Sequence, residues 1–259
     1  MKKGILIFCV FLLIGCIHKK EKWVFMMAGQ SNMAGRGIVE AQDTVTNSNI
    51  FMLNKEMKLV LAKEPLHFYE PKLDGLDCGL SFAKELHKNL PNNIDIVLVP
   101  CAVGGSSISQ WLGDSLFRNV KLYSNFKKRM EYAKSIGSIK GILWHQGESD
   151  AHQKTLPLYR KKLQQLFKNF RHDAGNDKLP ILVGELGNYA KPEKRNKNWK
   201  TLNSILHKIA EKDTNIYVIS SVGLTSNPDK VHFNSKSQRK LGKRFAKQFI
   251  KINKQKNNN

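Results

Sequence analysis

The sequence predicts an α/β protein in which helices cover both faces of an open, five-stranded parallel sheet. Three observations lead to this fold class. Five short apolar runs are spaced along the chain, segments with helical spacing of apolar residues lie between them, and no Gly/Ser-rich or Pro-rich tract interrupts the alternation. The 259 residues, 41% hydrophobic and 25% charged, therefore fit one globular domain.

The predicted strands are continuous apolar runs rather than alternating ones, which is typical of parallel strands buried on both faces. In chain order they cover residues 22–28, 94–100, 139–145, 180–186 and 215–221. Ligands of such sheets bind beyond the carboxyl ends of the strands. The polar loops that follow these runs are therefore the places to search for a functional site.

The predicted helices follow from apolar residues that recur every three or four positions. Residues 155–170 place five of them on one face: Tyr159, Leu163, Leu166, Phe167 and Phe170. Residues 198–210 show the same spacing, as does the segment 241–252. Because strands and helices alternate, the sequence favours a sheet with helices on both faces over a bundle or a sandwich of two sheets.

The N-terminal segment has the pattern of an export signal. Lys2 and Lys3 precede an apolar run over residues 4–17, which is short for a membrane span and fits a secretory signal. The run contains "LIGC", which resembles a bacterial lipobox and makes Cys16 the expected site of lipidation; an ordinary signal peptide or an uncleaved anchor is the alternative. We expect an exported lipoprotein, periplasmic or on the cell surface, anchored to a membrane by its acyl chains.

This interpretation divides the chain into four parts. They are a signal peptide (1–16), a short tether (17–22), a single domain (23–252) and a lysine- and asparagine-rich tail (253–259). Within the domain, Cys78 and Cys101 are the remaining cysteines, and the sequence leaves open whether they form a disulfide or stay as buried thiols.

The net charge of +22 permits binding to an acidic surface, but its distribution does not indicate nucleic acid as a partner. The lysines are scattered over every predicted helix instead of forming a stripe with interleaved aromatic residues. We interpret most of them as solvent-exposed positions.

Two of the polar loops could supply a nucleophile and its base. Ser31 follows the first predicted strand in the glycine-bearing stretch "GQSNMAGRG", where small neighbours allow a sharp turn that exposes the hydroxyl. Asp229 and His232 follow the last predicted strand, and their spacing lets the carboxylate hold a ring N–H of the histidine. The alternative for each is a structural role, such as capping a helix.

The other two loops could stabilise negative charge. Gly104 and Gly105 allow the backbone to approach a ligand closely, and Gln146 in "WHQGESD" could donate from its side-chain amide to an oxyanion. His145, Glu148 and His152 raise the question of a metal site. His145 still belongs to a strand, however, so the helical geometry of a zinc site is not available and no metal is predicted.

Together, "GQSNMAG", "VGGSSISQW", "WHQGESD" and "DKVHF" resemble the motifs of the SGNH-hydrolase superfamily, and in particular its sialate O-acetylesterase and carbohydrate esterase family six branch. The resemblance extends from Trp23 to about Phe249. It implies a flavodoxin-like three-layer α/β/α sandwich, and hydrolysis of acetyl esters on carbohydrates without a metal or other cofactor.

The resemblance also implies roles by position. Ser31 would be the nucleophile, His232 the general base and Asp229 the residue that orients it, with Glu148 as the alternative acid of the triad. The residues that would bind the substrate or its oxyanion are Gln30, Gly104, Gly105 and Gln146, together with the backbone amide of Ser31. Trp111 and the loop 185–192 are candidates for shaping a sugar site, unless they only pack or connect.

Three other functions stay open at this level. The chain could be a glycan-binding surface lipoprotein of the same fold without turnover, an esterase for other acyl groups, or a basic surface protein that binds through its lysines. Intact Ser31, Asp229 and His232 favour catalysis over the first of these. The sequence indicates neither the acetylated sugar, nor the oligomeric state, nor the membrane leaflet that would hold the anchor.

Overall fold

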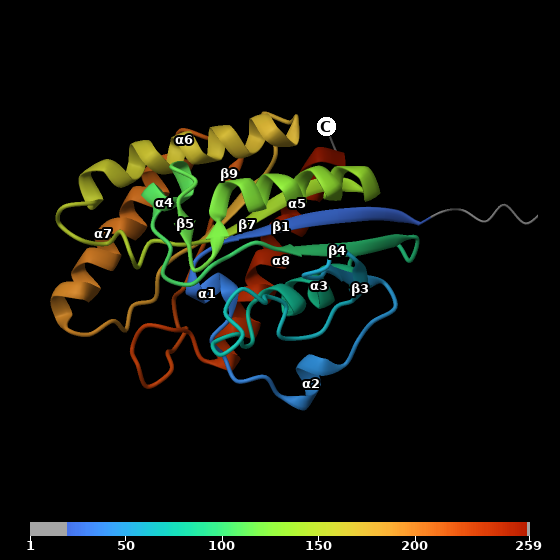
Figure 1. The fold of residues 1–259 in the computed structure, drawn as a ribbon, viewed down its shortest axis with the longest axis horizontal. Helices are drawn as coiled ribbons and strands as arrows, with labels where there is room; N and C mark the ends of the chain where they lie inside the picture. The colour runs from blue at the N-terminus through green and yellow to red at the C-terminus, as the bar shows by residue number, and fades with distance from the viewer. Residues whose placement is uncertain (1–19, 258–259) are drawn as a thin grey trace, which may run out of the picture.

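The computed structural model describes residues 20–257, and its centre is a seven-stranded sheet with the order β3-β2-β4-β1-β7-β8-β9 (Figure 1). The strands of this sheet are β1 (Glu21–Gly29), β2 (Ile50–Leu53), β3 (Leu59–Leu61), β4 (Ile94–Pro100), β7 (Ser138–His145), β8 (Ile181–Gly184) and β9 (Ile216–Ile219). Every neighbouring pair is parallel except β2 and β3, which are antiparallel.

The five predicted strands correspond to β1, β4, β7, β8 and β9. The prediction of a five-stranded sheet was wrong, because the sheet has seven strands. The missed strands, β2 and β3, extend one side of the sheet and are four and three residues long. Runs of this length do not stand out from the loops around them. In β3, Val60 and Leu61 are exposed, so its pattern lacks the buried apolar run that identifies the inner strands.

Helices cover both faces, which gives the predicted three-layer sandwich (Figure 1). Residues of α4 (Ile108–Leu112), α5 (Leu122–Ile136), α6 (Leu156–Ala174) and α7 (Glu193–Ala210) share one hydrophobic core with the sheet. Residues of α1 (Ser31–Ala34), α3 (Gly79–His87) and α8 (Ser235–Asn257) share the core on the opposite face. Two short elements lie in the connections, namely α2 (Ala41–Thr44) and the hairpin of β5 (Leu116–Phe117) and β6 (Val120–Lys121).

The ends of the domain differ slightly from the predicted boundaries. Strand β1 begins at Glu21, so part of the predicted tether belongs to the sheet. Helix α8 continues to Asn257 and therefore includes most of the predicted tail, because Ile252 is still buried against the core. The predicted signal peptide, with Cys16, lies outside the described residues. No helix within residues 20–257 has the length and apolarity needed to cross a membrane.

Cys78 and Cys101 are both buried and free. They lie in the cores on opposite faces of the sheet. Of the two possibilities left open by the sequence, a disulfide or buried thiols, the structure shows buried thiols. Burial raises the pKa of the Cys101 thiol to about 12 and that of Cys78 well above its usual value. Both side chains therefore act as small apolar groups in packing.

Candidate active site

The candidate site forms where β1, β4 and β7 end, as expected for a parallel sheet. The backbone N–H of Gln30 donates to the carbonyl oxygen of His145 at 2.9 Å, which holds the end of β1 against β7. Gly29 precedes it with a φ of 136°, and a Cβ atom there would collide with the carbonyl group of His145. Glycine at this position thus allows the chain to turn directly into α1, which begins with Ser31.

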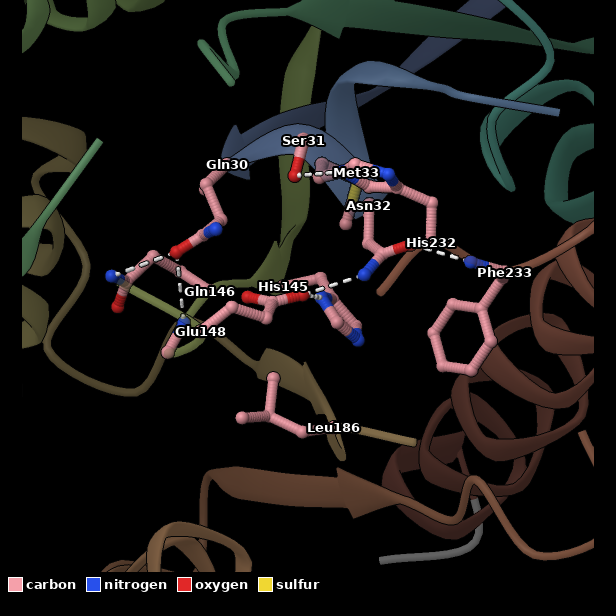
Figure 2. Close-up of polar contacts among 12 residues, drawn as sticks. Gln30, Ser31, Asn32, Met33, His145, Gln146, Glu148, Leu186, His232 and Phe233 are labelled. Carbon is pink, nitrogen blue, oxygen red and sulfur yellow. Dashed lines mark hydrogen bonds and ion pairs between the residues drawn. The ribbon is translucent and has the colours of Figure 1, made fainter. Parts of the chain in front are cut away.

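Ser31, His232 and Asp229 are brought together in a chain of hydrogen bonds. The Ser31 Oγ lies 3.0 Å from Nε2 of His232 (Figure 2). The other ring nitrogen of His232, Nδ1, lies 2.7 Å from Oδ2 of Asp229. The second carboxylate oxygen of Asp229 accepts the backbone N–H groups of Val231 and His232 at 2.8 and 3.0 Å. A carboxylate in this position favours the tautomer in which Nδ1 carries the proton and Nε2 faces the serine hydroxyl.

The electrostatic environment keeps Asp229 ionised. Burial acts to raise the pKa of Asp229, but the hydrogen bonds from the backbone of His232 and Val231 and from the His232 ring outweigh it. The pKa of this carboxyl group therefore lies below its usual value. Asp229 can thus hold a negative charge beside the imidazole over the whole range from weakly acidic to neutral pH.

Asn32 is a residue that the sequence interpretation missed. Its Oδ1 accepts the backbone N–H of Phe233 at 2.9 Å, and its Nδ2 donates to the carbonyl oxygen of Val231 at 3.2 Å. Asn32 therefore fixes the loop on both sides of His232, and Figure 2 shows its contact with Phe233. Only its position inside the motif "GQSN" could have indicated this role, because the loop it binds is about two hundred residues away.

Glu148, the predicted alternative to Asp229, lies in a different part of the site. Its Oε1 accepts from Nδ2 of Asn32 at 2.6 Å and lies 3.7 Å from Nδ1 of His145. The other ring nitrogen of His145 donates to the carbonyl oxygen of Glu185. The geometry thus places Asp229, and not Glu148, in contact with His232, while Glu148 supports the loop of His232 through Asn32 (Figure 2).

The predicted oxyanion donor Gln146 is turned into the protein, which is a correction to the sequence interpretation. Its side chain is completely buried, and its Nε2 donates to Asp150 Oδ2 at 2.6 Å and to the carbonyl oxygen of Ser106 at 3.1 Å. Its Oε1 accepts the hydroxyl of Tyr159. Because these partners use the amide group, Gln146 is not free to bind a substrate.

The side-chain amide of Gln30, unlike that of Gln146, faces the cavity. Its Oε1 accepts the backbone N–H groups of Gly147 and Ser149 at 3.3 and 3.2 Å, and these donors fix the orientation of the amide. Its Nε2 makes no hydrogen bond to another group among residues 20–257, and Gln30 lines the cavity beside Ser31. Gln30, which the sequence interpretation assigned to binding of the substrate or its oxyanion, therefore lies at the cavity with an amide nitrogen that has no partner within these residues.

The two glycines of the second loop have different environments. The backbone N–H of Gly104 donates to Oε2 of Glu70 at 2.6 Å, and this buried carboxylate also pairs with Arg36 at 2.8 Å and with Arg118. Gly104 is therefore not available as an oxyanion donor. Gly105 has a φ of 80°, lines the cavity and donates its N–H to no other group in the described part of the chain.

These residues surround a cavity of about 630 Å³. Trp199 lines it, whereas the predicted candidate Trp111 is completely buried and packs edge-to-face on Trp144 at 5.4 Å between ring centroids. Arg195 also lines the cavity, is exposed and forms no ion pair with any residue from 20 to 257. Within the same residues, no three His, Cys, Asp or Glu side chains form an arrangement that could hold a metal ion.

Residues 21–251 match the family model described as carbohydrate esterase, sialic acid-specific acetylesterase. The chain is 29% identical over 249 residues to a probable carbohydrate esterase of Arabidopsis thaliana, and the match covers 88% of this chain and 90% of the relative. A crystal structure of an Arabidopsis protein, also 29% identical, has a TM-score of 0.76 and covers 88% of this chain and 98% of its own.

Two more distant structures share the fold. NanS is 17% identical with a TM-score of 0.75, over 93% of this chain and 100% of its own. A carbohydrate acetylesterase from Xanthomonas citri is 21% identical with a TM-score of 0.61, over 87% of this chain and 54% of that one.

Proposed function

Because the chain belongs to the sialic acid-specific acetylesterase family of carbohydrate esterases and is thus a carboxylic ester hydrolase, we propose that it removes O-acetyl groups from carbohydrates with Ser31 as the nucleophile. The observation that carries this proposal is the hydrogen-bonded series from Ser31 Oγ through His232 to Asp229 at the edge of the cavity. These are the parts that a serine esterase needs, at distances at which a proton can move.

The proposed reaction has two steps. His232 Nε2 accepts the Ser31 proton while Oγ attacks the acetyl carbonyl carbon; the bond to the sugar oxygen then breaks, and His232 returns the proton to that oxygen. In the second step a water molecule gives a proton to His232 while its oxygen attacks the acetyl carbonyl carbon. The bond to Ser31 Oγ then breaks, His232 returns the proton to Oγ, and acetic acid leaves and ionises to acetate. Asp229 stabilises the imidazolium in both steps.

The tetrahedral intermediates carry a negative oxygen that needs donors. We assign this role to the backbone N–H groups of Ser31 and Gly105 and to Nε2 of Gln30, because each lies at the cavity and has no other partner among residues 20–257. This set replaces Gly104 and Gln146 in the assignment expected from the sequence. Removing one preorganised donor of this kind from the oxyanion hole of a serine protease costs about 2.7–4 kcal/mol of transition-state stabilisation.

We propose further that the preferred acetylated sugar carries a carboxylate. Arg195 is exposed at the cavity and unpaired within the described part of the chain, and an arginine can bind a carboxylate with two parallel hydrogen bonds. An O-acetylated sialic acid would satisfy this group, whereas an acetylated neutral xylan would not. We therefore place acetylated acidic sugars ahead of acetylated xylan as substrates.

Acetate release tests the proposal. The purified protein is expected to hydrolyse p-nitrophenyl acetate and to prefer O-acetylated sialic acid over acetylated xylo-oligosaccharides. Ser31→Ala and His232→Ala are each expected to lower kcat by about 10⁴-fold or more. Ser48→Ala, at an exposed serine outside the site, serves as the control and is expected to retain full activity.

Two results would contradict the proposal. Binding of acetylated sugars without any acetate release would indicate a glycan-binding protein, and release that Ser31→Ala does not reduce would exclude this nucleophile. Export and lipidation at Cys16 remain predictions from the sequence. Metabolic labelling with a radioactive fatty acid, compared between the unmodified chain and Cys16→Ser, would detect the lipid, and label on both proteins would contradict the predicted site.

A further inference from the structure

A second cavity, of about 530 Å³, adjoins the first one at Arg118, whose side chain lines both. It lies between the segment 68–71, the β5–β6 hairpin and the first turns of α5. The described residues that line it include no Asp or Glu but five basic ones: Lys55, Arg118, Lys121, Lys128 and Arg129. The cavity is therefore a positively charged neighbour of the candidate active site.

The aromatic side chains in this cavity are held in fixed positions. Phe68 and Tyr69 are half-buried, with ring centroids 4.6 Å apart, and the Arg129 guanidinium lies 5.0 Å from the Phe68 ring. The Tyr69 hydroxyl donates to the carbonyl oxygen of Pro100 at 3.1 Å and accepts from Nδ2 of Asn125 at 2.8 Å. Rigid aromatic faces with polar groups at their edges suit a pyranose ring, which has an apolar C–H face and a rim of hydroxyl groups.

The charges at the rim are available to a ligand. Lys55, Lys121 and Lys128 are exposed, and none of them forms an ion pair with a side chain in the part of the chain that the structure describes. Positive groups that line a concavity without compensating carboxylates attract anions to it. The chemistry of the lining thus favours a sugar that carries a carboxylate over a neutral one.

Arg118 stands at the boundary of the two cavities in an unusual conformation. It and Asn119 form the two-residue turn of the β5–β6 hairpin with φ values of 49° and 62°. Positive φ is common for Asn in such turns but unfavourable for Arg. Arg118 nevertheless occupies this position, where it forms an ion pair with Glu70 and lines both cavities. Such backbone strain is typical of functional positions.

The geometry points to a second glycan subsite in this cavity, which binds a carboxylate-bearing sugar next to the acetylated one in the same chain. The inference rests on the proposed function, because the acetylated sugar would occupy the first cavity while its neighbour passes Arg118 into the second. Uronic acids and sialic acids share the required chemistry. Phe68 and Tyr69 would contact the ring of this sugar, and Lys55 and Lys128 its carboxylate.

Binding measurements on Ser31→Ala protein test the subsite without turnover. The probes are tetragalacturonic acid, a tetramer of α2,8-linked sialic acid, and neutral xylotetraose, titrated by calorimetry at fixed ionic strength. The added change Lys55→Glu with Lys128→Glu is expected to raise Kd for at least one acidic tetramer by about tenfold or more. Which tetramer responds identifies the kind of acidic sugar, and the Kd of xylotetraose is expected to change less than about twofold.

A matched pair of charge reversals separates the subsite from the general effect of net charge. Lys161 and Lys200 are exposed, line neither cavity and form no ion pair with residues 20–257, so Lys161→Glu with Lys200→Glu is expected to leave every Kd unchanged. Unchanged binding of both acidic tetramers by the Lys55/Lys128 variant would overturn the subsite. So would an equal loss in the control pair.

Hydrolysis of p-nitrophenyl acetate separates this inference from the proposed function. This small ester does not reach the second cavity, so the Lys55/Lys128 variant with Ser31 intact is expected to hydrolyse it at the unmodified rate. A protein that hydrolyses acetyl esters but binds acidic tetramers independently of these lysines would keep the esterase and exclude the subsite. A protein that releases no acetate would exclude the esterase, and the binding measurements would still decide the subsite.

Discussion

Asp229 and His232 lie three residues apart in one loop, whereas the glycine loop that faces them is held by Glu70, a carboxylate 34 residues away from Gly104. The two carboxylates also differ in environment. The side chain of Asp229 is 45% exposed, and that of Glu70 is 3% exposed and paired with Arg36 and Arg118. The site therefore has a local side, the Asp229–His232 pair within one loop, and a long-range side, the glycine loop, whose position depends on a buried carboxylate distant in the sequence and on its ion pairs with Arg36 and Arg118.

The largest effect is expected on the local side. Asp229→Asn should lower kcat by about 10⁴-fold, because an amide at this position favours the wrong tautomer of His232. Glu148→Gln should lower kcat by less than about tenfold, since Glu148 contacts Asn32 and not His232. Initial rates of acetate release by both variants check the prediction. Equal losses, or a larger loss for Glu148→Gln, would identify Glu148 as the acid of the triad.

A smaller effect is expected on the long-range side. Glu70→Gln keeps an acceptor for the N–H of Gly104 but loses the charge that binds Arg36 and Arg118. We expect kcat to fall by about 10²-fold through a misplaced Gly105, with KM for p-nitrophenyl acetate nearly unchanged.

The pH profile distinguishes this positioning role from the role of Asp229. Glu70→Gln should lower kcat by the same factor at every pH, whereas Asp229→Asn should shift the pH at which kcat falls on the acidic side of its profile. Glu131→Gln, which removes an exposed ion pair with Lys134, is the control and should have full activity. A rise in KM alone would mean that Glu70 acts in binding and not in placing the oxyanion donors.

The smallest effect is expected on the pH dependence of the free energy of unfolding. The contribution of a carboxyl group on the long-range side changes with pH in the opposite direction to that of Asp229. Glu64 lies in the same segment as Glu70. Burial, followed by the negative charge of Asp77, raises the pKa of Glu64 well above 4.5, whereas the pKa of Asp229 is lowered. The folded state therefore holds the Glu64 proton more tightly than the unfolded state. Its contribution to stability is present below pH 4.5 and is lost as pH rises from there through the folded pKa.

Thermal unfolding across this range measures the effect. The unfolding temperature of the unmodified protein should contain a component that declines from pH 4.5 upward, and Glu64→Gln should remove it because an amide does not titrate. The corresponding component from Asp229 runs the other way, since it is lost as pH falls through its lowered pKa. Parallel profiles for the unmodified protein and Glu64→Gln would show that Glu64 is not protonated in the folded state.

The difference between the two sides also explains what the sequence could predict. The inner strands and the Asp229–His232 pair follow from patterns within a few residues, namely apolar runs and a fixed spacing. Strands β2 and β3 were missed because they are short and one of them is exposed at the edge of the sheet. Local patterns thus predicted the inner strands of the sheet and the pairing of Asp229 with His232, but not the two strands at its edge.

The long-range side could not be predicted in the same way. Gln30 and Gln146 are the same residue type, and each follows a buried strand. The amide nitrogen of Gln30 lies at the cavity without a hydrogen-bond partner among residues 20–257, whereas that of Gln146 donates to Asp150 inside the protein. Nothing in the sequence near Glu70 indicates that its carboxylate takes the N–H of Gly104. These assignments depend on which segments meet in three dimensions, and such contacts leave no periodic signal.

The contact between Ser31 and His232 joins positions that are 201 residues apart. Ser31, the proposed nucleophile, is synthesised with the first strand of the sheet, but the imidazole that it contacts follows the last one. A chain still emerging from the ribosome therefore contains a serine turn without a base, and contacts of such long sequence separation form slowly in folding. Hydrolytic activity thus reports on completion of the whole fold, and it should appear only after α8 has docked.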